Sequence, residues 1–328
     1  MLRHEVVGVA PESTGERGRL WYSEPATRWF EALPIGTGRL GGMVHSGDSV
    51  ERIRLSESTA WSGAAATTDV SPTGLQNLPR IRELLSRARY AEAQALAGEH
   101  LLGRPSSFGT NVSLPELLLS FAGDGETTGY ERSLDLADVI VRTSFVRGGI
   151  AFDREVFASH ADQVIVVRST TSSPSDFKVS FADGAITAEI STVDDTVVLR
   201  GHAYEELHSN GEAGSAYEIC AWVITDGTVS KAADHLLVKG AITATVIVAV
   251  GTDWLGDDAA AYSSRVLDHA TEAGFDQLRQ AHLADYTPLV RRVPLDLGRS
   301  DDAVRALPTA DRRALFAKGS EDPELVAL

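Results

Sequence analysis

Glu57 and Trp61 combine residue types that suit contact with a polyhydroxyl ligand, and they lie close together in the sequence. A tryptophan face offers apolar area to the C–H side of a sugar ring, and a nearby carboxylate accepts directional hydrogen bonds from hydroxyl groups. The alternative is structural: Trp61 anchors a core or an interface, and Glu57 pairs with an arginine such as Arg39 or Arg54. Partner binding is a third option, so the sequence leaves the role of this pair open.

Arg39 belongs to a glycine-rich block, residues 36–44 (GTGRLGGMV). Its planar guanidinium suits a bidentate contact across a domain boundary, and the glycines allow two backbones to approach closely. A turn inside one domain accounts for the block equally well. We therefore treat Arg39, Glu57 and Trp61 as candidates for a carbohydrate contact or a domain interface.

The sequence contains few motifs that indicate other catalytic or metal-binding chemistry. It contains no GxSxG, HExxH, P-loop or CxxC pattern, and its nine histidines are scattered. Cys220 is the only cysteine, which excludes a disulfide framework and a thiolate metal site. Neighbouring acids, such as residues 194–195 and 205–206, are typical of turns and solvated faces. The sequence thus predicts no catalytic residue, no metal site and no cofactor in this chain.

Charge and hydropathy narrow the classes of partner. Thirty Lys and Arg residues stand against 46 Asp and Glu, and the net charge of −16 argues against binding to a phosphate backbone. Hydrophobic residues make up 43% of the chain and charged residues 23%, as in ordinary globular proteins. No run is long and apolar enough for a signal peptide or a membrane span. The chain as given is expected in the cytoplasm, while export of the full-length protein stays open.

Short runs with a two-residue period fill most of the chain from residue 117 to residue 250. They end at Gly or Asp turns, such as residues 147–149 and 226–227. Many short strands at this spacing favour a mainly β fold built as a large antiparallel β-sandwich. Including one earlier run, the predicted strands are 50–55, 140–145, 150–157, 164–167, 177–181, 186–190, 197–200, 217–225, 228–231, 236–238 and 243–250.

Helical periodicity interrupts this pattern twice before the C-terminal region. Residues 77–103 predict two short inserted helices, with Asn77 as the first cap, that cover a sheet. Residues 257–298 predict a C-terminal helical linker that breaks at Gly274 and ends in a strand at 293–297.

Two further helix signals follow the linker. Thr309 is expected to cap a short helix that ends at Gly319. Asp322, Pro323 and Glu324 form a helix start signal, with a cap, a proline in the first turn and an acid beside the helix N-terminus.

Residues 29–44 (WFEALPIGTGRLGGMV) and 55–63 (LSESTAWSG) carry the most specific pattern in the chain. They resemble the amino-terminal domain of glycoside hydrolase family 95, the inverting α-L-fucosidases, in which the blocks read close to EALPLGNGRLGAMV and LNEDTLWSG. The resemblance continues through residues 78–103, 142–168 and 282–297. This chain departs from the family blocks at Thr37, Ser56, Ser58 and Ala60.

The resemblance implies a domain organisation. A flexible N-terminus, residues 1–18, precedes a β-supersandwich at 19–256 and a helical linker and strand at 257–298. Residues 299–328 correspond to the truncated start of an (α/α)6 catalytic barrel, which in the family holds the general acid and the water-activating residues. The chain alone is therefore expected to be inactive, although the family is one of glycosidases.

The resemblance also implies a function and its partners. The domain would brace the missing barrel and shape its substrate mouth, and the whole enzyme would hydrolyse terminal α-L-fucosides of a glycan, or α-L-galactosides, with inversion and without a cofactor. The alternative is a stand-alone, lectin-like carbohydrate-binding β-sandwich. A weaker alternative is a degenerate gene product without activity.

Overall fold

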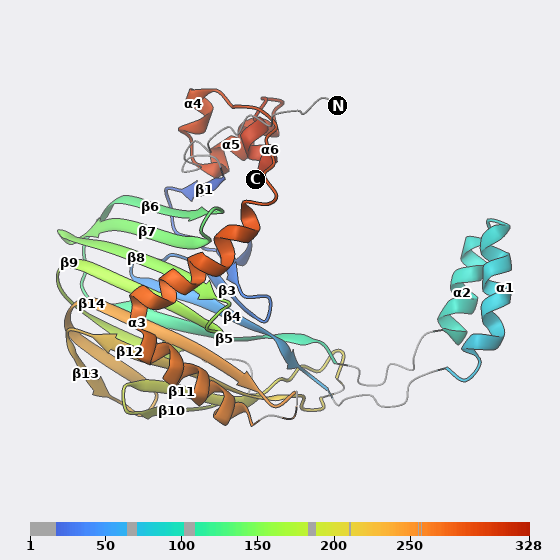
Figure 1. Ribbon diagram of the computed structural model, residues 1–328, viewed down its shortest axis with the longest axis horizontal. Coiled ribbons are helices and arrows are strands. Elements are labelled where there is room, and N and C mark those ends of the chain that lie inside the picture. Colours follow the sequence, from blue (N-terminus) through green and yellow to red (C-terminus); the bar gives the residue numbers. More distant parts are fainter. Residues whose placement is uncertain are drawn as a thin grey trace, which may run out of the picture.

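The computed structural model describes residues 18–63, 71–101, 109–182, 188–209, 211–254, 256 and 258–328 (Figure 1). Within these ranges, antiparallel pairing joins fourteen strands into one sheet, in the order β1-β6-β7-β8-β9-β14-β12-β11-β10. Strands β5, β4, β3 and β2 branch from β9, and β13 pairs with β14. The mainly β, antiparallel fold predicted from the sequence is confirmed. The strands are β1 (Arg19–Tyr22), β2 (Leu33–Gly36), β3 (Leu40–Val44), β4 (Val50–Trp61), β5 (Asn111–Phe121), β6 (Thr127–Asp135), β7 (Ile140–Arg147), β8 (Ile150–Ser159), β9 (Val164–Phe181), β10 (Glu189–Val193), β11 (Thr196–His202), β12 (Ala216–Thr225), β13 (Thr228–Lys231) and β14 (His235–Thr252).

Two long strands, β9 and β14, turn this sheet into a sandwich of two layers. The first part of β9 pairs with β8, and its last part, residues 177–181, pairs with β5. Strand β14 likewise pairs first with β13 and later with β12. The register between β9 and β14 shifts on both sides of Ala241, and such bulges let strands bend without leaving the ladder. The sequence predicted two separate strands in each case, 164–167 and 177–181 for β9, and 236–238 and 243–250 for β14 with a turn at 239–240. Both divisions are wrong, because each strand is continuous.

The main core fills the space between the two layers. Because successive side chains of a strand point to opposite faces, buried residues alternate along β4 and β7. Burial of apolar surface contributes roughly 25 cal/mol per Å², so this interior is the principal force that holds the layers together. Fully buried members include Ile53, Leu117, Val156, Val179 and Val248.

Helix α3 (Ala259–Val290) lies along the outer face of one layer (Figure 1). It starts at Asp258, whose carboxylate accepts a hydrogen bond from the Ala261 amide at 2.8 Å. It bends at Gly274, where φ is 73°, so the predicted break is confirmed. Apolar side chains of α3 form a second core with the outer face of the sheet. Its buried residues include Phe157, Val166, Ile247, Leu267, Ala270 and Leu278.

Helices α1 (Gly74–Ser86) and α2 (Tyr90–His100) form a hairpin that packs on itself. Helix α1 starts before Asn77, so Asn77 is not its cap, and the Asn77 amide instead donates to the Thr73 carbonyl at 3.0 Å. Figure 1 shows the hairpin standing away from the sheet, so the prediction that it covers a sheet is wrong. The buried residues of the hairpin are Gly74, Ile81, Leu84 and Ala93.

Three short helices follow α3: α4 (Asp302–Arg305), α5 (Thr309–Phe316) and α6 (Pro323–Ala327). Helix α6 starts as predicted, because the Asp322 carboxylate accepts a hydrogen bond from the Leu325 amide at 3.0 Å. A buried ion pair holds α6 against α5: two nitrogens of Arg312 lie 2.8 and 2.6 Å from the two carboxylate oxygens of Asp322.

Two details of the C-terminal region differ from the prediction. Pro308, not Thr309, occupies the cap position of α5, and the Thr309 hydroxyl accepts a hydrogen bond from the Trp21 amide of β1 at 2.9 Å. Residues 293–297 form no strand, because no neighbouring strand pairs with them in the described sheet. The side chains of Val293, Leu295 and Leu297 are exposed there.

Some predictions fall outside the described residues. These are the flexible N-terminus at 1–18, apart from Gly18, the helix stop at Gly103, and residues 186–187 of the strand predicted at 186–190. In the part of the chain that the structure describes, no helix has the length and apolarity needed to cross a membrane.

Candidate functional site

Arg39 lies in the turn between β2 and β3, so the glycine-rich block forms a hairpin within the sheet. The Thr37 amide donates to the Leu40 carbonyl at 2.8 Å and closes the turn. Gly38 has φ 89°, a backbone conformation that glycine adopts without strain. The turn projects Arg39 toward the place where β4, β14 and α3 meet.

The Arg39 guanidinium joins four separate parts of the chain. Its Nη1 donates to Glu57 Oε1 and to the Val250 carbonyl, both at 3.1 Å, and its Nε donates to Gln163 Oε1 at 2.9 Å. The guanidinium carbon also lies 5.0 Å from the ring centroid of Tyr262 on α3, a cation–π distance. Arg39 therefore ties the β2–β3 hairpin to the start of the linker helix.

The Glu57 carboxylate is fully buried, and hydrogen bonds within the protein occupy both of its oxygens. Oε1 accepts from Arg39, while Oε2 accepts from the amide and the hydroxyl of Thr59, each at 2.6 Å. The structure thus brings Arg39 and Glu57 together as an ion pair. In this arrangement the carboxylate positions other groups and does not present an oxygen to a ligand.

Trp61 connects to this ion pair through a chain of hydrogen bonds. The Ser215 hydroxyl donates to the Thr59 carbonyl at 2.8 Å and accepts from the Trp61 amide at 3.1 Å. The Thr59 hydroxyl also lies 2.6 Å from that of Thr252, at the end of β14. Trp61 is half-buried. Its role at a carbohydrate or domain contact stays a prediction, as do those of Arg39 and Glu57.

Glu205 forms the next polar contact beyond Trp61. Its carboxylate accepts hydrogen bonds from the Ser62 hydroxyl at 3.0 Å and from the His208 amide at 2.9 Å. Removal from water raises the pKa of Glu205, but the bonds from His208 and Ser62 outweigh this effect and hold the pKa below its ordinary value. Glu205 is therefore an anionic group that fixes the end of β4, and not a proton donor.

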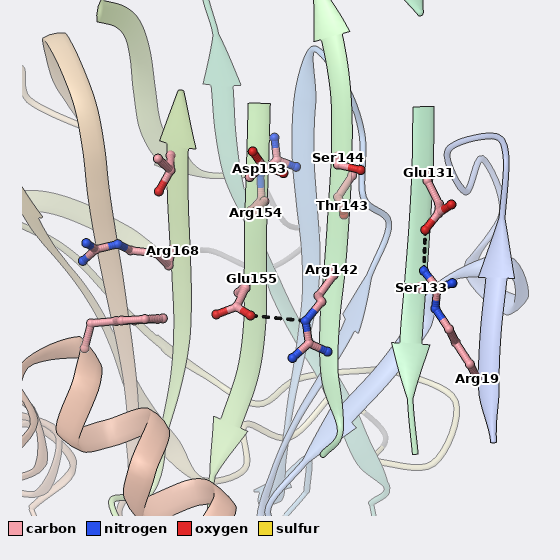
Figure 2. Close-up of a pocket in the computed structure, with 12 residues that line it drawn as sticks. Arg19, Glu131, Ser133, Arg142, Thr143, Ser144, Asp153, Arg154, Glu155 and Arg168 are labelled. Atoms are coloured by element: carbon pink, nitrogen blue, oxygen red, sulfur yellow. Dashed lines mark hydrogen bonds and ion pairs between the residues drawn. The ribbon is translucent and has the colours of Figure 1, made fainter. Parts of the chain in front are cut away.

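A polar groove of about 440 Å³ lies on the outer face of the same sheet, beside α3 (Figure 2). Its floor comes from β6, β7, β8 and β9, and Phe275 of α3 forms one wall. Figure 2 shows two ion pairs in it, Arg19 with Glu131 and Arg142 with Glu155. Sequence reasoning missed this groove, although alternating polar residues on β7 and β8 are the signal that marks a polar outer face.

Metal ligation finds no support in the described ranges. No group of three or more His, Cys, Asp or Glu side chains there is placed to hold a metal ion. Cys220 is buried within the second core, and burial together with the charge of Glu218 raises the pKa of its thiol to about 12. The thiol is therefore neutral and unsuited to nucleophilic chemistry.

Comparison with known families accounts for almost the whole chain. Residues 20–257 match the family model described as the glycosyl hydrolase family 65 N-terminal domain. The chain belongs to this family. A second stretch, residues 274–328, matches the glycosyl hydrolase family 95 catalytic domain. The resemblance to family 95 that the sequence motifs indicated is therefore confirmed.

Three curated relatives of this chain carry the names of α-fucosidases. Alpha-L-fucosidase 2 of Arabidopsis thaliana is 30% identical, in a match that covers 94% of this chain and 40% of the relative. Probable alpha-fucosidase A of Aspergillus oryzae is 25% identical, over 91% of this chain and 44% of the relative. Probable alpha-fucosidase A of Aspergillus niger is 24% identical, over 81% of this chain and 36% of the relative. The chain thus spans less than half the length of these relatives.

Proposed function

We propose that this chain is the N-terminal β-sandwich region of an α-L-fucosidase-like glycoside hydrolase. In this proposal the whole enzyme hydrolyses terminal α-L-fucosides of a glycan with inversion. The observation that carries it is the order of the family matches: one chain contains an N-terminal domain match at 20–257 and a family 95 catalytic-domain match at 274–328. Two α-fucosidase relatives align with more than nine tenths of this chain.

The sandwich is proposed to brace a catalytic barrel through α3. This helix spans the interval between the two family matches, and Leu267 and Leu278 bury it against the sheet. Arg39 adds a polar contact at its start through Tyr262. Because these contacts fix the helix against the sheet, α3 sets the orientation of the region that follows it relative to the sandwich.

The carboxylates of the Arg39 network are unsuited to the chemical step. Inversion needs two carboxyl groups roughly 6.5 to 9.5 Å apart, one protonated and one able to activate water. Glu57 is buried and fully hydrogen-bonded, and Glu205 is held anionic by its neighbours. The acid and the base are therefore assigned to a barrel, and Trp61 is proposed to form part of the sugar-facing wall.

A stand-alone lectin-like module is the second candidate. Such a module buries its apolar surface, whereas a domain that braces another one keeps apolar side chains at the surface it shares. Leu289, Val293, Leu295 and Leu297 are all exposed within nine residues. This run supports the bracing role over the stand-alone module.

Hydrolysis of an aryl α-L-fucoside tests the proposal. The chain is assayed alone and again after addition of a family 95 barrel as a second polypeptide. We expect activity only in the mixture, and NMR of the first-formed sugar should show the anomer opposite to that of the substrate. Activity from the chain alone would refute the assignment of the carboxylates to a barrel. Absence of activity in a mixture that forms a stable complex would refute the fucosidase assignment.

A further inference from the structure

The groove of Figure 2 is lined by two adjacent rows of side chains that cross the sheet. One row contains Ser144, Asp153 and Thr170, which are direct cross-strand partners on β7, β8 and β9. Neighbouring strands lie about 4.8 Å apart, so the row spans roughly 10 Å. Its three side chains are half-buried or exposed, and they can meet a ligand from solvent.

The second row, also formed by cross-strand partners, contains Arg142, Glu155 and Arg168. Arg142 Nε lies 3.3 Å from Glu155 Oε1, and Arg279 of α3 reaches Glu155 Oε2 at the same distance. Arg168 donates to the Thr245 hydroxyl at 2.8 Å. These contacts hold the charged heads in fixed places along the groove.

Phe275 closes the side of the groove next to α3. The Arg168 guanidinium lies 4.8 Å from its ring centroid, and Phe157 packs against the same ring at 6.0 Å. The bend at Gly274 directly precedes Phe275 in the helix. The wall is therefore built from packed side chains, and it does not need a ligand to form.

The first row differs from the second in its free hydrogen-bonding capacity. Among the described residues, no hydrogen bond or ion pair reaches the carboxylate of Asp153 or the hydroxyls of Ser144 and Thr170. An exposed carboxylate flanked by two hydroxyls accepts and donates several directional hydrogen bonds. A ligand with many hydroxyl groups can satisfy all three at once.

Charge decides which kind of polyhydroxyl ligand fits. The lining carries three cations, Arg19, Arg142 and Arg168, and three anions, Glu131, Asp153 and Glu155. Beside the lining, Arg279 pairs with Glu155 and Asp138 pairs with Arg142, so these two charges also cancel. The Arg154 guanidinium turns away to pair with the buried Glu51. The groove is thus close to neutral in a chain whose net charge is −16. A neutral ligand avoids repulsion from the protein as a whole, which an acidic one does not.

We infer that this groove is a binding site for a neutral oligosaccharide, with Ser144, Asp153 and Thr170 as the groups that contact its hydroxyls. The site is formed entirely by the sandwich and α3. It rests on the proposed function only in the choice of a fucosylated sugar as one probe.

Calorimetry and saturation-transfer NMR test the inference on the 328-residue chain. The probes are fucosyllactose and maltotriose, which are neutral, and sialyllactose, which is acidic. We expect saturable binding of at least one neutral trisaccharide and weaker binding of the acidic one. No binding of either neutral sugar, or tighter binding of sialyllactose, would overturn the site. Binding of maltotriose alone would support the groove while giving no support to the fucosidase assignment.

Substitutions then locate the bound sugar. Asp153→Asn keeps the shape of the side chain and should weaken binding about tenfold or more, since a hydrogen bond to a charged group is lost. Ser144→Tyr should abolish binding by filling the floor. The matched controls are Asp124→Asn, an exposed aspartate in the β5–β6 loop, and Val146→Tyr, an exposed position further along β7. Both control variants should bind the sugar with the affinity of the unmodified chain. If Ser144→Tyr and Asp153→Asn also bound with that affinity, the inference would be refuted.

Discussion

The Arg39 guanidinium lies 3.1 Å from the Glu57 carboxylate, and the two side chains differ in their exposure to water. A quarter of the Arg39 side chain is exposed, whereas none of the Glu57 side chain is. A buried carboxylate without a cation is strongly unfavourable, so the pair constrains the hairpin and β4 to one arrangement. Because Arg39 also contacts Tyr262, this constraint extends to α3.

Loss of Arg39 should therefore destabilise the sandwich. We expect Arg39→Met to lower the free energy of unfolding by about 3 kcal/mol, because it leaves a buried charge unpaired. The double variant Arg39→Met with Glu57→Gln should lose less unfolding free energy than Arg39→Met alone, because it leaves no buried charge unpaired. Urea unfolding followed by tryptophan fluorescence measures these changes.

The control for this prediction is Arg52→Met, because half of the Arg52 side chain is exposed and its partner Glu116 keeps a second arginine, Arg54, at 3.7 Å. Exposed pairs contribute about 0 to 1 kcal/mol, so this variant should unfold almost like the unmodified chain. If Arg39→Met and Arg52→Met lowered the free energy of unfolding equally, the Arg39–Glu57 pair would contribute no more to stability than the Arg52–Glu116 pair.

Local signals predicted much of the sheet. The strand at 228–231 has the predicted bounds, and the hairpin between β7 and β8 turns at Gly148 and Gly149, which have φ 57° and 80°. These features depend on turn residues and on a two-residue period, which are visible within a few positions. The continuity of β9 and β14 through their bend depends on pairing between distant strands, so the sequence prediction interrupted both, at 168–176 and at a turn at 239–240.

The candidate site was predicted only in part. The sequence proposed an Arg39–Glu57 pair as one alternative, and the structure shows it. It could not show that Thr59 occupies the other oxygen of Glu57, since that depends on local strand geometry. The groove was beyond prediction because its lining comes from five strands and one helix.

Acid should loosen the C-terminal helices. Hydrogen bonds from Arg312 lower the pKa of Asp322 to about 2, against about 3.9 in an unfolded chain. Because the folded pKa is the lower one, the stabilisation is complete above about pH 4 and is lost as the pH falls toward 2. The protection of α5 and α6 amides against hydrogen exchange, taken as the ratio of intrinsic to observed rate at each pH, should therefore fall across this window.

Asp322→Asn tests the origin of that pH dependence. The variant should exchange faster than the unmodified chain at pH 7, because Arg312 remains buried without an anion. It should also lose the fall in protection between pH 4 and pH 2. An unchanged profile in Asp322→Asn would assign the acid response to other carboxylates.

Cys220 should resist thiol reagents while the protein is folded. Burial is the larger cause that raises its pKa to about 12, and the charge of Glu218 adds to it. The reactive species is the thiolate, which is scarce at pH 8 for such a group. Colour from an aromatic disulfide reagent should appear only as urea unfolds the chain, and rapid labelling without urea would contradict the packing of α3 over β12.

Gly274 should be required for the bend of α3. Its φ of 73° and ψ of 171° lie in a region that is essentially restricted to glycine, and a Cβ there would meet no atom within 4 Å. Gly274→Ala should therefore cost about 1–3 kcal/mol through backbone strain alone, measured as the free energy of unfolding. Gly98→Ala in α2 is the matched control, because it also meets no atom within 4 Å but has helical geometry, and it should stabilise by about 0.5–1 kcal/mol. A Gly274→Ala variant that relieved its strain by straightening the helix would move Phe275 away from Arg168, and the groove would lose its wall. Sugar binding should therefore weaken in Gly274→Ala and stay unchanged in Gly98→Ala.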